Sequence, residues 1–382
     1  MNIVHINPFF HPFLGGTENY LLDLSKRLAK KHDVSVITSL LPGTASYEEY
    51  LGIKIYRLPS LVLRKLPSFL PPPFSMPIGF GYYFSKICRK EKPDIVHLHN
   101  RFAPQFDSVI FWKRLFRTPL FLNIHNSRPI GINPQTDLFG GIYDDTIGRL
   151  IMKSCDRIIA NSRYSLDVTV PDSYPKQKQE VIYNGIDTKI YRKKKSHIKD
   201  ELGCEHLLLS VGRLLPQKGL EYLIRALPDV EADYHYLMLG EGPERDNLQR
   251  LINKLGLQKR VTIMGKVPDS RKIECYSDAD IFVHPSLYEP FGIVLVEAMA
   301  TECAVVSTAV GGIPEVVGDA GILVEPKQPK QIANAIEKIA HDKKLMGRYK
   351  KLGRERTEKI FDWDIIAGQF EKSYRNYLEA NK

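Results

Sequence analysis

The sequence is poor in cysteine, and the few cysteines it has are dispersed. Its 382 residues include only Cys88, Cys155, Cys204, Cys275 and Cys303, with no CxxC pair among them. An odd and scattered set argues against a disulfide framework or a cysteine zinc site, and it favours a reducing compartment. The strand-like start MNIVHI lacks the basic n-region of a signal peptide, so we expect a cytoplasmic protein.

Long apolar runs that are free of proline are also missing. The uncharged stretch of residues 66–85 is about long enough to span a membrane. Five prolines exclude a regular helix through most of it, namely Pro67, Pro71, Pro72, Pro73 and Pro77. We therefore expect a long apolar loop here and no membrane-spanning segment.

What the sequence does have is length and an uneven excess of positive charge. With 382 residues, 43% hydrophobic and 26% charged, it is typical of a globular chain of two or three domains. Residues 1–190 carry +8 of the net +10, from 24 basic and 16 acidic residues. Residues 51–117 alone carry +9, from 12 basic and 3 acidic residues, so a nucleic acid, an anionic membrane or an anionic substrate is a candidate partner.

Short β-branched runs alternate with helical patterns along the chain. The first half has a helical pattern at 18–31 and strand-like runs at 2–6, 34–38, 95–98, 120–124, 157–161 and 180–184. After the polar segment 191–205, interpreted as a linker, strand-like runs recur at 207–211, 234–239, 261–264, 280–283, 304–307 and 322–324. This alternation predicts two doubly wound α/β domains with parallel sheets. Ligands of such sheets bind at the carboxyl ends of the strands, so the loops there are the candidate sites.

Three loops of the first half carry candidate residues. Gly15 and Gly16 precede a predicted helix, whose N-terminal N–H groups suit an anion, although a simple tight turn is as good an interpretation. His99 and Asn100 end one strand, and the pair His125 and Asn126 follows another. A lone histidine is more often structural than catalytic, but two at equivalent strand ends improve the case. Zinc is not expected, because no third ligand has a suitable spacing.

Two loops of the second half are more specific. In SVGRLLPQKG, the residues Gly212, Arg213 and Lys218 follow a strand. The forked guanidinium of Arg213 and the ammonium of Lys218 can neutralise a diphosphate there. In SLYEPFGIVLVEAMA, a helix is predicted to begin near Gly292 and to expose the N–H groups of residues 292–294. Glu289 and Glu297 are solvated in the simplest interpretation. Placed on either side of a phosphate-binding helix start, they instead suit the hydroxyl groups of a sugar–diphosphate–ribose ligand.

Taken in order, these motifs resemble a retaining glycosyltransferase of family 4 (glycosyl transferases group 1), which has the GT-B fold. The resemblance covers nearly the whole chain, and its most specific part is E-x7-E together with G-R-x4-K-G. The motifs are GGTE (15–18), DIVHLHN (94–100), NIHN (123–126), NGID (184–187), VGRLLPQKG (211–219), LGEGPE (239–244), Glu289-x7-Glu297 and GGIPEVV (311–317).

The resemblance implies a domain organisation. In the GT-B fold two Rossmann-like domains face each other across a cleft. It implies an acceptor-binding domain at residues 1–190 and a nucleotide-sugar-binding domain at 191–361. A C-terminal helix at 362–382, around Trp363, is expected to cross back onto the first domain.

The resemblance also implies roles for single residues. Arg213 and Lys218 would hold the diphosphate and stabilise the leaving group, Glu289 would bond donor-sugar hydroxyls, and Glu297 would bond the ribose. His125 would lie near the anomeric carbon on the acceptor side, where the family often has an acidic residue at the position of Asn126. The other residues implied at the donor are Gly15, Gly16, Gly212, Lys266, Val267, Phe291, Gly292, Ile293 and Val294, and those implied at the acceptor are His99, Asn100 and Asn126.

Function is then expected to be transfer of a hexose, with retention, from a UDP-, GDP- or ADP-sugar to a lipid, lipid-linked or glycan acceptor. Neither a metal nor a cofactor is implied, since the nucleotide-diphosphate sugar is a co-substrate. One alternative is a GT-B nucleotide-sugar epimerase, which would not need the apolar segment near residues 60–84. Another is a noncatalytic nucleic-acid-binding protein that uses the basic region. It is disfavoured because it leaves Arg213, Lys218, Glu289 and Glu297 unexplained.

The basic, apolar region suggests where the acceptor is found. The stretch 66–85 is flanked by Arg64, Lys65, Lys86, Arg89 and Lys90. Aromatic groups of this kind either cover the first domain's core or contact a membrane, and we favour an anionic membrane surface. Shallow insertion is expected of Phe69, Phe74 and Phe80. The protein would then be cytoplasmic and peripheral on the inner membrane face, with no nucleic-acid partner.

Overall fold

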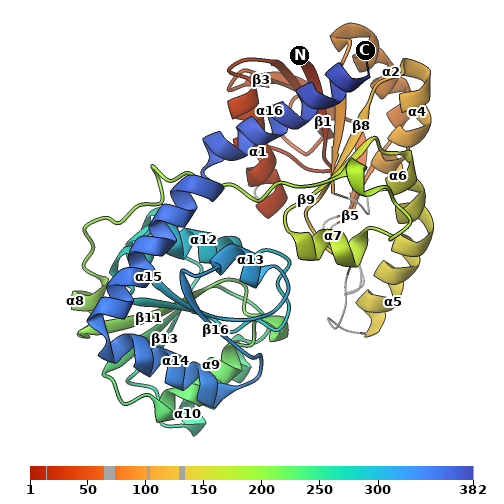
Figure 1. The fold of residues 1–382 in the computed structure, drawn as a ribbon. Coiled ribbons are helices and arrows are strands. Elements are labelled where there is room, and N and C mark those ends of the chain that lie inside the picture. Colours follow the sequence, from red (N-terminus) through yellow and green to blue (C-terminus); the bar gives the residue numbers. More distant parts are fainter. Residues whose placement is uncertain (14, 64–73, 101–103, 129–133, 382) are drawn as a thin grey trace. The chain divides into compact units, whose positions relative to one another are not determined.

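The computed structural model describes residues 1–382 except 14, 64–73, 101–103, 129–133 and 382. The chain forms two compact units (Figure 1). The first unit comprises Met1–Asn184 and Trp363–Lys382, and the second comprises Gly185–Asp362. The boundaries predicted from the sequence, after residues 190 and 361, lie close to these two boundaries.

The first unit is built on an eight-stranded sheet. Its strands are β1 (Asn2–Ile6), β2 (Asp33–Ser39), β3 (Tyr47–Tyr50), β4 (Ile53–Leu58), β7 (Ile95–His99), β8 (Leu120–Ile124), β9 (Arg157–Ala160) and β10 (Gln179–Val181). Their order is β10-β9-β8-β7-β1-β2-β4-β3, and every pair is parallel except β3 with β4. The central strands are buried because helices cover both faces, which explains their nearly continuous apolar sequences.

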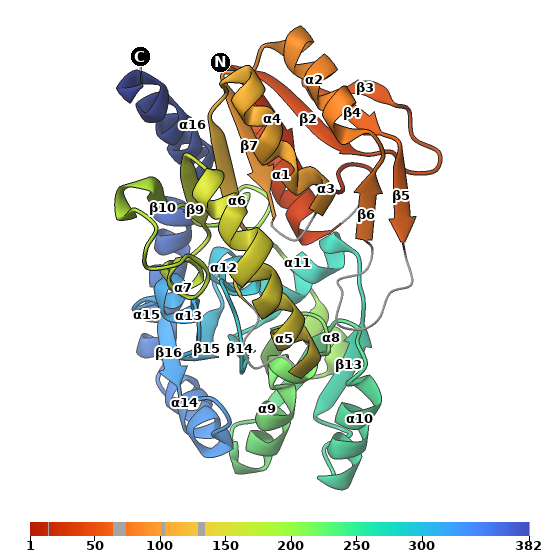
Figure 2. The ribbon, with the colours of Figure 1, turned by 90° about the vertical axis from the view of Figure 1, so that its right-hand side faces the viewer.

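Two helices from opposite ends of the chain cover one face of this sheet. They are α1 (Gly16–Leu28) and α16 (Trp363–Ala380), whose buried side chains share a core with Ile3, Val36 and Phe121. Trp363 of α16 packs on Tyr20 of α1 with ring centroids 5.1 Å apart. The C-terminal helix is therefore part of the first unit (Figures 1 and 2).

The other face is covered by a row of helices. They are α2 (Phe80–Glu91), α3 (Pro104–Asp107), α4 (Val109–Phe116), α6 (Arg149–Ser154) and α7 (Arg163–Thr169). α6 continues a longer helical rod that begins with α5 (Pro134–Tyr143) and passes through the π-turn η1 (Asp144–Gly148). The rod and α4 lie side by side in both ribbon views, and Lys113 of α4 donates to the Ser154 carbonyl at 2.8 Å.

The prediction of an apolar loop at 66–85 is wrong for those of its residues that the structure describes. Residues Phe74–Pro77 form strand β6, which pairs antiparallel with β5 (Ser60–Leu63), and α2 follows after Gly79. Pro77 ends a strand of a two-stranded sheet, a position that tolerates proline. Within the described ranges, no helix combines the length and the apolar character needed to cross a bilayer.

The membrane-insertion prediction for single aromatics also needs correction. Phe80 is buried against Phe84 and Phe106 in the core, so it cannot insert into a membrane. Phe74 is half-buried, whereas Lys86, Arg89 and Lys90 are exposed as expected. Phe69, Arg64 and Lys65 lie outside the described residues.

The second unit has a six-stranded, wholly parallel sheet. Its strands are β11 (His206–Val211), β12 (Tyr234–Leu239), β13 (Val261–Gly265), β14 (Ile281–His284), β15 (Ala304–Thr308) and β16 (Gly321–Val324), in the order β13-β12-β11-β14-β15-β16. The chain reverses its direction of winding between β11 and β14. Such a topological switch point is where open α/β sheets bind ligands.

Seven helices of this unit bear on the site or the core. They are α9 (Leu220–Ala226), α10 (Arg245–Lys254), α11 (Asp269–Asp278), α12 (Ile293–Ala300), α13 (Ile313–Val317), α14 (Pro329–His341) and α15 (Lys343–Arg356). The segment 191–205, interpreted as a linker, is instead folded into the unit. It contains α8 (Ile198–Leu202) with buried Ile198, and Lys199 pairs with Asp280 at 2.7 Å.

Candidate active site

The residues expected at the donor lie along the carboxyl edge of the second unit's sheet. Gly212 and Arg213 follow β11, Lys266 follows β13, and Glu289 lies in the loop after β14. Because all strands are parallel, these loops gather at one edge. Arg213 is exposed, and its side chain has neither an ion pair nor a hydrogen bond among the residues that the structure describes. A free guanidinium at the switch point is available to an anionic ligand.

Glu289 forms a buried network with Lys218 and His284. Its Oε2 lies 2.6 Å from Lys218 Nζ and 3.0 Å from His284 Nε2. Burial would raise the pKa of Glu289, but the hydrogen bond from His284 and the charge of Lys218 outweigh it and lower the pKa to about 2. Burial lowers the pKa of His284, so its ring is neutral and donates from Nε2. The solvated interpretation of Glu289 is therefore wrong.

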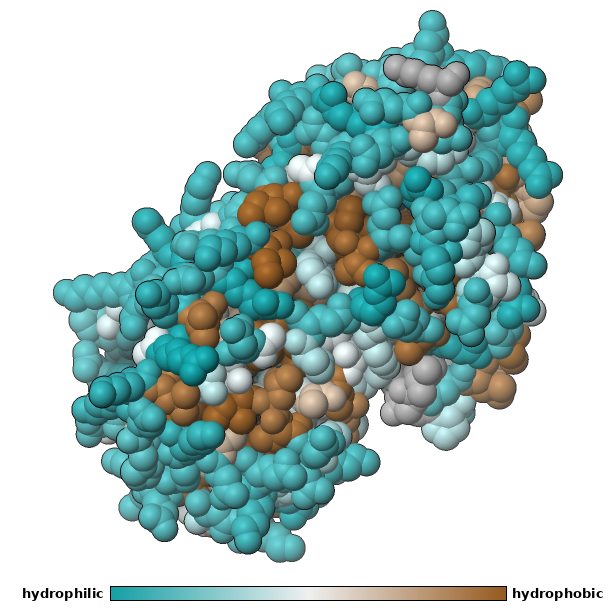
Figure 3. All heavy atoms as spheres, in the orientation of Figure 1, coloured by the Kyte–Doolittle hydropathy of each residue, from teal (hydrophilic) through white to brown (hydrophobic). Residues whose placement is uncertain are grey.

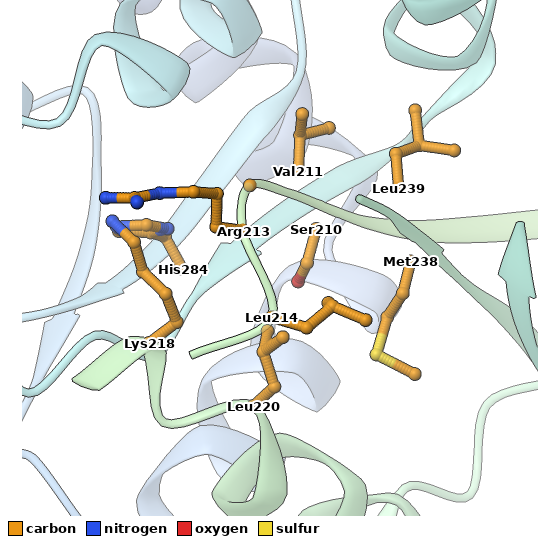
Figure 4. Close-up of a pocket in the computed structure, with 10 residues that line it drawn as sticks. Ser210, Val211, Arg213, Leu214, Lys218, Leu220, Met238, Leu239 and His284 are labelled. Atoms are coloured by element: carbon orange, nitrogen blue, oxygen red, sulfur yellow. The ribbon is translucent and has the colours of Figure 1, made fainter. Parts of the chain in front are cut away.

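Figure 4 shows the side chains of Arg213 and Lys218 ending beside the His284 ring. Below them is a small cavity between β11, β12 and the turn that carries Lys218. It is lined by Ser210, Val211, Gly212, Arg213, Leu214, Lys218, Leu220, Met238, Leu239 and His284. His284 is not among the residues expected from sequence, because its importance depends on its contact with Glu289.

Two glycines allow the loop after β14 to lie against its neighbours. Gly219 has φ +61°, and a Cβ there would come within 2.2 Å of the Pro285 carbonyl oxygen. Gly311 has φ +57°, and a Cβ there would come within 2.1 Å of the Glu289 carbonyl oxygen, which the Gly312 N–H also approaches at 2.9 Å. Only glycine permits both the backbone angle and the approach. The GGIPEVV and QKG motifs thus hold the loop that carries Glu289.

α12 begins where the sequence predicts it. Gly292 caps it in the left-handed region at φ +89°, and the N–H groups of Gly292, Ile293 and Val294 have no acceptor among the described residues. Open N–H groups and the helix dipole favour an anion at this end. Phe291 differs from expectation, since its side chain is buried against Phe361 with ring centroids 5.9 Å apart. Only its backbone is left for a ligand.

Glu297 is also held from inside the protein. Its Oε1 lies 3.1 Å from Lys272 Nζ, its Oε2 accepts from the Tyr276 hydroxyl at 2.8 Å, and only 8% of the residue is exposed. Burial lowers the pKa of Lys272, but the nearby Glu297 carboxylate raises it above its usual value. The solvated interpretation is wrong for Glu297 too. Lys272 lies on α11, and no sequence pattern links it to Glu297.

Lys266 and Val267 follow the edge strand β13. Lys266 is exposed and Val267 is half-buried. Both are accessible from the carboxyl edge, so their expected place beside a nucleobase stays a prediction.

In the first unit, the expected residues at the β7 and β8 ends do not all reach the surface. His125 is half-buried, and Tyr20 packs edge-on to it with centroids 4.5 Å apart. His99 is fully buried, with ring nitrogens 2.9 Å from His5 and 3.2 Å from His125. The prediction that His99 binds the acceptor is therefore wrong, because no part of it is open to a ligand.

Asn100, Asn126 and the glycine pair remain accessible. Asn100 is half-buried with φ +66°, an angle that asparagine tolerates, and Asn126 is exposed. At the start of α1, a Cβ on Gly15 would meet the Glu18 carboxylate at 2.2 Å, whereas one on Gly16 would meet nothing within 4 Å. Burial raises the pKa of Glu18. This carboxylate occupies the anion-binding end of α1 that is expected to assist the donor.

The structure also gathers three histidines that sequence spacing could not connect. His5, His97 and His99 are fully buried and each offers a ligand atom within 4.8 Å of the others. His5 pairs with His97 across β1 and β7, and residues two apart on a strand share a face. The argument that a third zinc ligand is lacking therefore fails, because His5 is far from the other two in sequence but lies on the neighbouring strand.

Comparison with known families identifies the chain. Residues 14–190 match the model described as Glycosyltransferase Family 4, and residues 192–356 match Glycosyl transferases group 1. This chain is a group 1 glycosyltransferase. The match to both halves confirms the family inferred from the motifs.

Curated relatives extend over nearly the whole chain. An uncharacterized glycosyltransferase of Methanocaldococcus jannaschii is 29% identical, covering 96% of this chain and 95% of its own. A phosphatidylinositol N-acetylglucosaminyltransferase subunit of Arabidopsis thaliana is 26% identical, covering 100% of this chain and 83% of its own. N-acetyl-alpha-D-glucosaminyl L-malate synthase of Bacillus anthracis is 26% identical, covering 97% of each.

Solved structures agree on the fold. Sucrose-phosphate synthase from Thermosynechococcus elongatus has a TM-score of 0.80 at 25% identity, covering 99% of each chain. The Anabaena protein HepE, solved with UDP, has a TM-score of 0.79 at 23% identity, covering 98% of this chain and 100% of its own. These likenesses confirm the GT-B fold class of this glycosyltransferase.

Proposed function

We propose that this glycosyltransferase moves a hexose, with retention and without a catalytic metal or cofactor, from a nucleotide-diphosphate sugar to a lipid or lipid-linked acceptor. One observation carries the donor part. Arg213, Lys218 and the open start of α12 all lie on the carboxyl edge of one sheet. Negative charge builds on the leaving nucleoside diphosphate as the glycosidic bond breaks, and fixed cations and N–H groups stabilise it.

A UDP-sugar is the preferred donor. The support is the UDP-bound structure of the Anabaena neighbour. Lys266 and Val267 would lie along the base, Glu297 at the ribose, and Glu289 at the hexose. The resting contacts of the two glutamates favour these roles, since each carboxylate is held in place before a ligand arrives.

The contacts of Glu289 bear on how the reaction retains the anomeric configuration of the sugar. Lys218 and His284 both bind the same carboxylate oxygen, and the pKa of about 2 keeps the group ionised but strongly stabilised. A carboxylate held in this way is a weak nucleophile, because attack would break its contacts. Glu289 is therefore assigned to hydroxyl binding, and the acceptor attacks from the face of the leaving group without a covalent enzyme intermediate.

The test of the proposed function is a thermal-shift panel with UDP-, GDP- and ADP-sugars, followed by turnover. A UDP-sugar is expected to stabilise the protein most, by about 2.7 kcal/mol at 100 times its Kd. Release of UDP should increase when an acceptor is supplied. Interconversion of UDP-sugars without an acceptor would favour the epimerase alternative, and no stabilisation by any nucleotide sugar would contradict the proposal.

Calorimetry should distinguish the roles of the two glutamates. We expect Glu297→Gln to weaken UDP and UDP-glucose alike, and Glu289→Gln to weaken UDP-glucose while leaving UDP nearly unchanged. Removing one partner of a buried pair also destabilises a fold, so thermal unfolding must be measured on both variants. Equal loss of UDP affinity in both would overturn the division of roles.

A basic, apolar surface on the first unit supports a membrane acceptor. Most exposed large apolar side chains of the described chain lie on the helical row α2–α4, in the turn before α2, or on the α5–α6 rod. They are Ile78, Tyr82, Phe111, Leu115, Leu138, Phe139, Ile142, Ile147 and Leu150. In Figure 3, apolar atoms line the margin of the first unit where Figure 1 places α4 and α5. We call this set the apolar ridge.

Cations accompany the apolar ridge. Lys86, Arg89, Arg114, Arg117, Arg149 and Lys153 are exposed and have no ion pair among the described residues. Arg149, Lys153 and Lys178 also line a cavity of about 190 Å³ beside the rod. Apolar groups next to unpaired cations suit an anionic lipid surface, where each cation adds about 1 kcal/mol. The Arabidopsis relative is named for phosphatidylinositol, which favours a lipid acceptor, whereas the Bacillus relative is named for malate.

Binding to anionic vesicles tests this part. The protein should sediment with vesicles that contain phosphatidylglycerol at low salt, and less so at high salt. Changing Phe111 and Leu115 to serine, or Arg149 and Lys153 to glutamate, should release it to the supernatant. Lys254→Glu on the second unit serves as a charge control. If wild type stays in the supernatant, a soluble acceptor is the better proposal, and the thermal-shift result is unaffected.

A further inference from the structure

Three histidines of the first unit form a chain of nitrogen-to-nitrogen hydrogen bonds that ends at His125. His5 Nδ1 lies 2.9 Å from His99 Nε2, and His99 Nδ1 lies 3.2 Å from His125 Nε2. His5 belongs to β1, His99 ends β7, and His125 follows β8. His5 and His99 are fully buried, and His125 is half-buried. The chain thus runs from the interior of the sheet to the edge where ligands of α/β sheets bind.

The chain has a direction, because a neutral imidazole carries one N–H and every proton in such a chain must point the same way. His5 Nε2 has no partner among the described atoms, so a proton there would be an unsatisfied buried donor, and the His5 proton is placed on Nδ1, where His99 Nε2 accepts it. His99 then donates from its own Nδ1 to His125 Nε2, which leaves the proton of His125 on Nδ1. The Asn123 amide nitrogen, 3.1 Å from the same Nε2, also bonds to the Tyr20 hydroxyl oxygen at 3.3 Å.

The chain is neutral at ordinary pH. Burial lowers the pKa values of His5 and His125 to about 3, and it holds the pKa of His99 well below its usual range. Adjacent charged imidazoles would also repel one another. Neutral rings keep the alternation of donor and acceptor that fixes each tautomer.

We propose that His5 and His99 are positioning residues, which fix the orientation and tautomer of His125 so that its Nδ1–H is presented to a substrate oxygen. The inference rests on the proposed function insofar as His125 serves the acceptor side. A ring held through one nitrogen has its other nitrogen committed to a single role. His125 is accordingly a hydrogen-bond donor to a sugar hydroxyl, and it is not a general base.

The arrangement costs stability, which argues against a purely structural purpose. His5 Nε2 and Asn123 Oδ1 are buried without a hydrogen-bond partner among the described atoms. An apolar ring at position 5 would leave no such atom, whereas a buried polar atom without a partner destabilises the fold. His97 Nε2 is unpartnered as well, so the cost belongs to the whole buried histidine cluster, and a violation of folding preferences on this scale is typical of a functional site.

A metal ion is the competing explanation for buried histidines. His5, His97 and His99 have the right residue type, and their ligand atoms lie within 4.8 Å of one another. Both ring nitrogens of His99 are already engaged, however, one by His5 and one by His125. His99 therefore has no free lone pair for an ion, and the chain accounts for its position without one.

The test uses ¹⁵N-histidine-labelled full-length protein, in which the nitrogen chemical shifts of each imidazole report its tautomer. The His125 signal is assigned by its loss in His125→Gln. In wild type His125 should carry its proton on Nδ1, and in His99→Phe it should shift toward the Nε2–H form that free histidine prefers. His97→Phe is the matched control, because His97 is equally buried on the same face but bonds to Tyr374 instead of to the chain.

Activity gives a second readout. We expect His99→Phe to lower kcat roughly tenfold or more with little change in the KM for donor. His97→Phe should retain most of the activity. If His99→Phe does not fold, His5→Phe and His99→Gln replace it, because each interrupts the chain at a different atom. Absence of turnover in wild type would contradict the proposed function. The nitrogen shifts would still report whether His5 and His99 fix the tautomer of His125.

Three results would overturn the inference. The first is an Nε2–H tautomer of His125 in wild type, and the second is an unchanged tautomer in both His99→Phe and His5→Phe. The third is stoichiometric zinc, measured by mass spectrometry on the purified protein and lost equally from His5→Phe, His97→Phe and His99→Phe.

Discussion

Arg213→Ala and Lys218→Ala should each lower kcat/KM for donor turnover by at least about 10²-fold, or about 2.7 kcal/mol of transition-state stabilisation. Both cations end at the same place on the carboxyl edge of the second sheet, beside His284 (Figure 4). In the proposed mechanism, the charge that they meet grows as the nucleoside diphosphate departs, so the loss should appear in kcat. The measurement is steady-state release of UDP from UDP-glucose.

The two variants should differ in their effect on the resting enzyme. Arg213 has no partner among the described residues, so its removal should leave the melting temperature unchanged. Lys218 pairs with Glu289 at 2.6 Å, and without it the pKa of Glu289 should rise from about 2 toward its ordinary range. Lys254→Ala, an exposed cation at the end of α10, is the control and should retain full activity. Near-wild-type turnover in Arg213→Ala would refute its assignment.

Most of the sheet architecture could be predicted from the sequence, because parallel strands that are buried on both faces consist of uninterrupted β-branched runs. The run VSVIT became β2, and YHYLML became β12 with the predicted bounds. The region after β2 could not be predicted in the same way. Strands β3 to β6 lie at or next to the edge of the sheet or in a two-stranded pair, where half-buried Glu48 and Lys54 and the prolines weaken the apolar pattern.

The proposed donor site was partly predictable for a similar reason. Loops after parallel strands are functional by topology, so Arg213, Glu289 and the start of α12 could be identified from local motifs. The partners of those residues could not. Lys272 lies 25 residues before Glu297, nothing local distinguishes His284 from an ordinary strand end, and the glycine at 311 is explained only by its approach to the Glu289 backbone. These contacts are set by tertiary packing.

The histidine chain shows which features of a buried cluster the sequence does not predict. His97 and His99 are two residues apart on one strand, so they share a face, and this much follows from DIVHLHN. The burial of His97 does not follow, because it depends on α16, which returns from the far end of the chain and places Phe370 and Tyr374 against its ring. His99 packs in turn against the rings of His5, His97 and Tyr20. Sequence alone consequently assigns His99 to a ligand, whereas it belongs to the interior.

The same buried histidines should make the first unit sensitive to mild acid. His5, His97, His99 and His125 have pKa values lowered mainly by burial, so the folded state stays neutral while the unfolded chain takes up protons below about pH 6.5. The unfolded state then binds more protons, and stability falls as the pH drops below about 6.5 toward the lowered pKa values of the folded state. At pH 5.5 each histidine costs about 1.4 kcal/mol, or roughly 6 kcal/mol for the four, a large share of a domain's stability.

Tryptophan fluorescence isolates this effect, since both tryptophans, Trp112 and Trp363, belong to the first unit. Urea unfolding followed at pH 7.5, 6.5 and 5.5 should show a midpoint that drops steeply over the last step. Because Glu289 has its pKa lowered to about 2, its contribution is retained throughout this window, and it lies in the other unit. His97→Phe should reduce the pH dependence by about a quarter, as one of four such groups, whereas exposed His341→Gln should leave it unchanged. A midpoint that does not move between pH 7.5 and 5.5 would mean that the imidazoles gain protons in the folded state, and the neutral hydrogen-bonded chain would then be wrong.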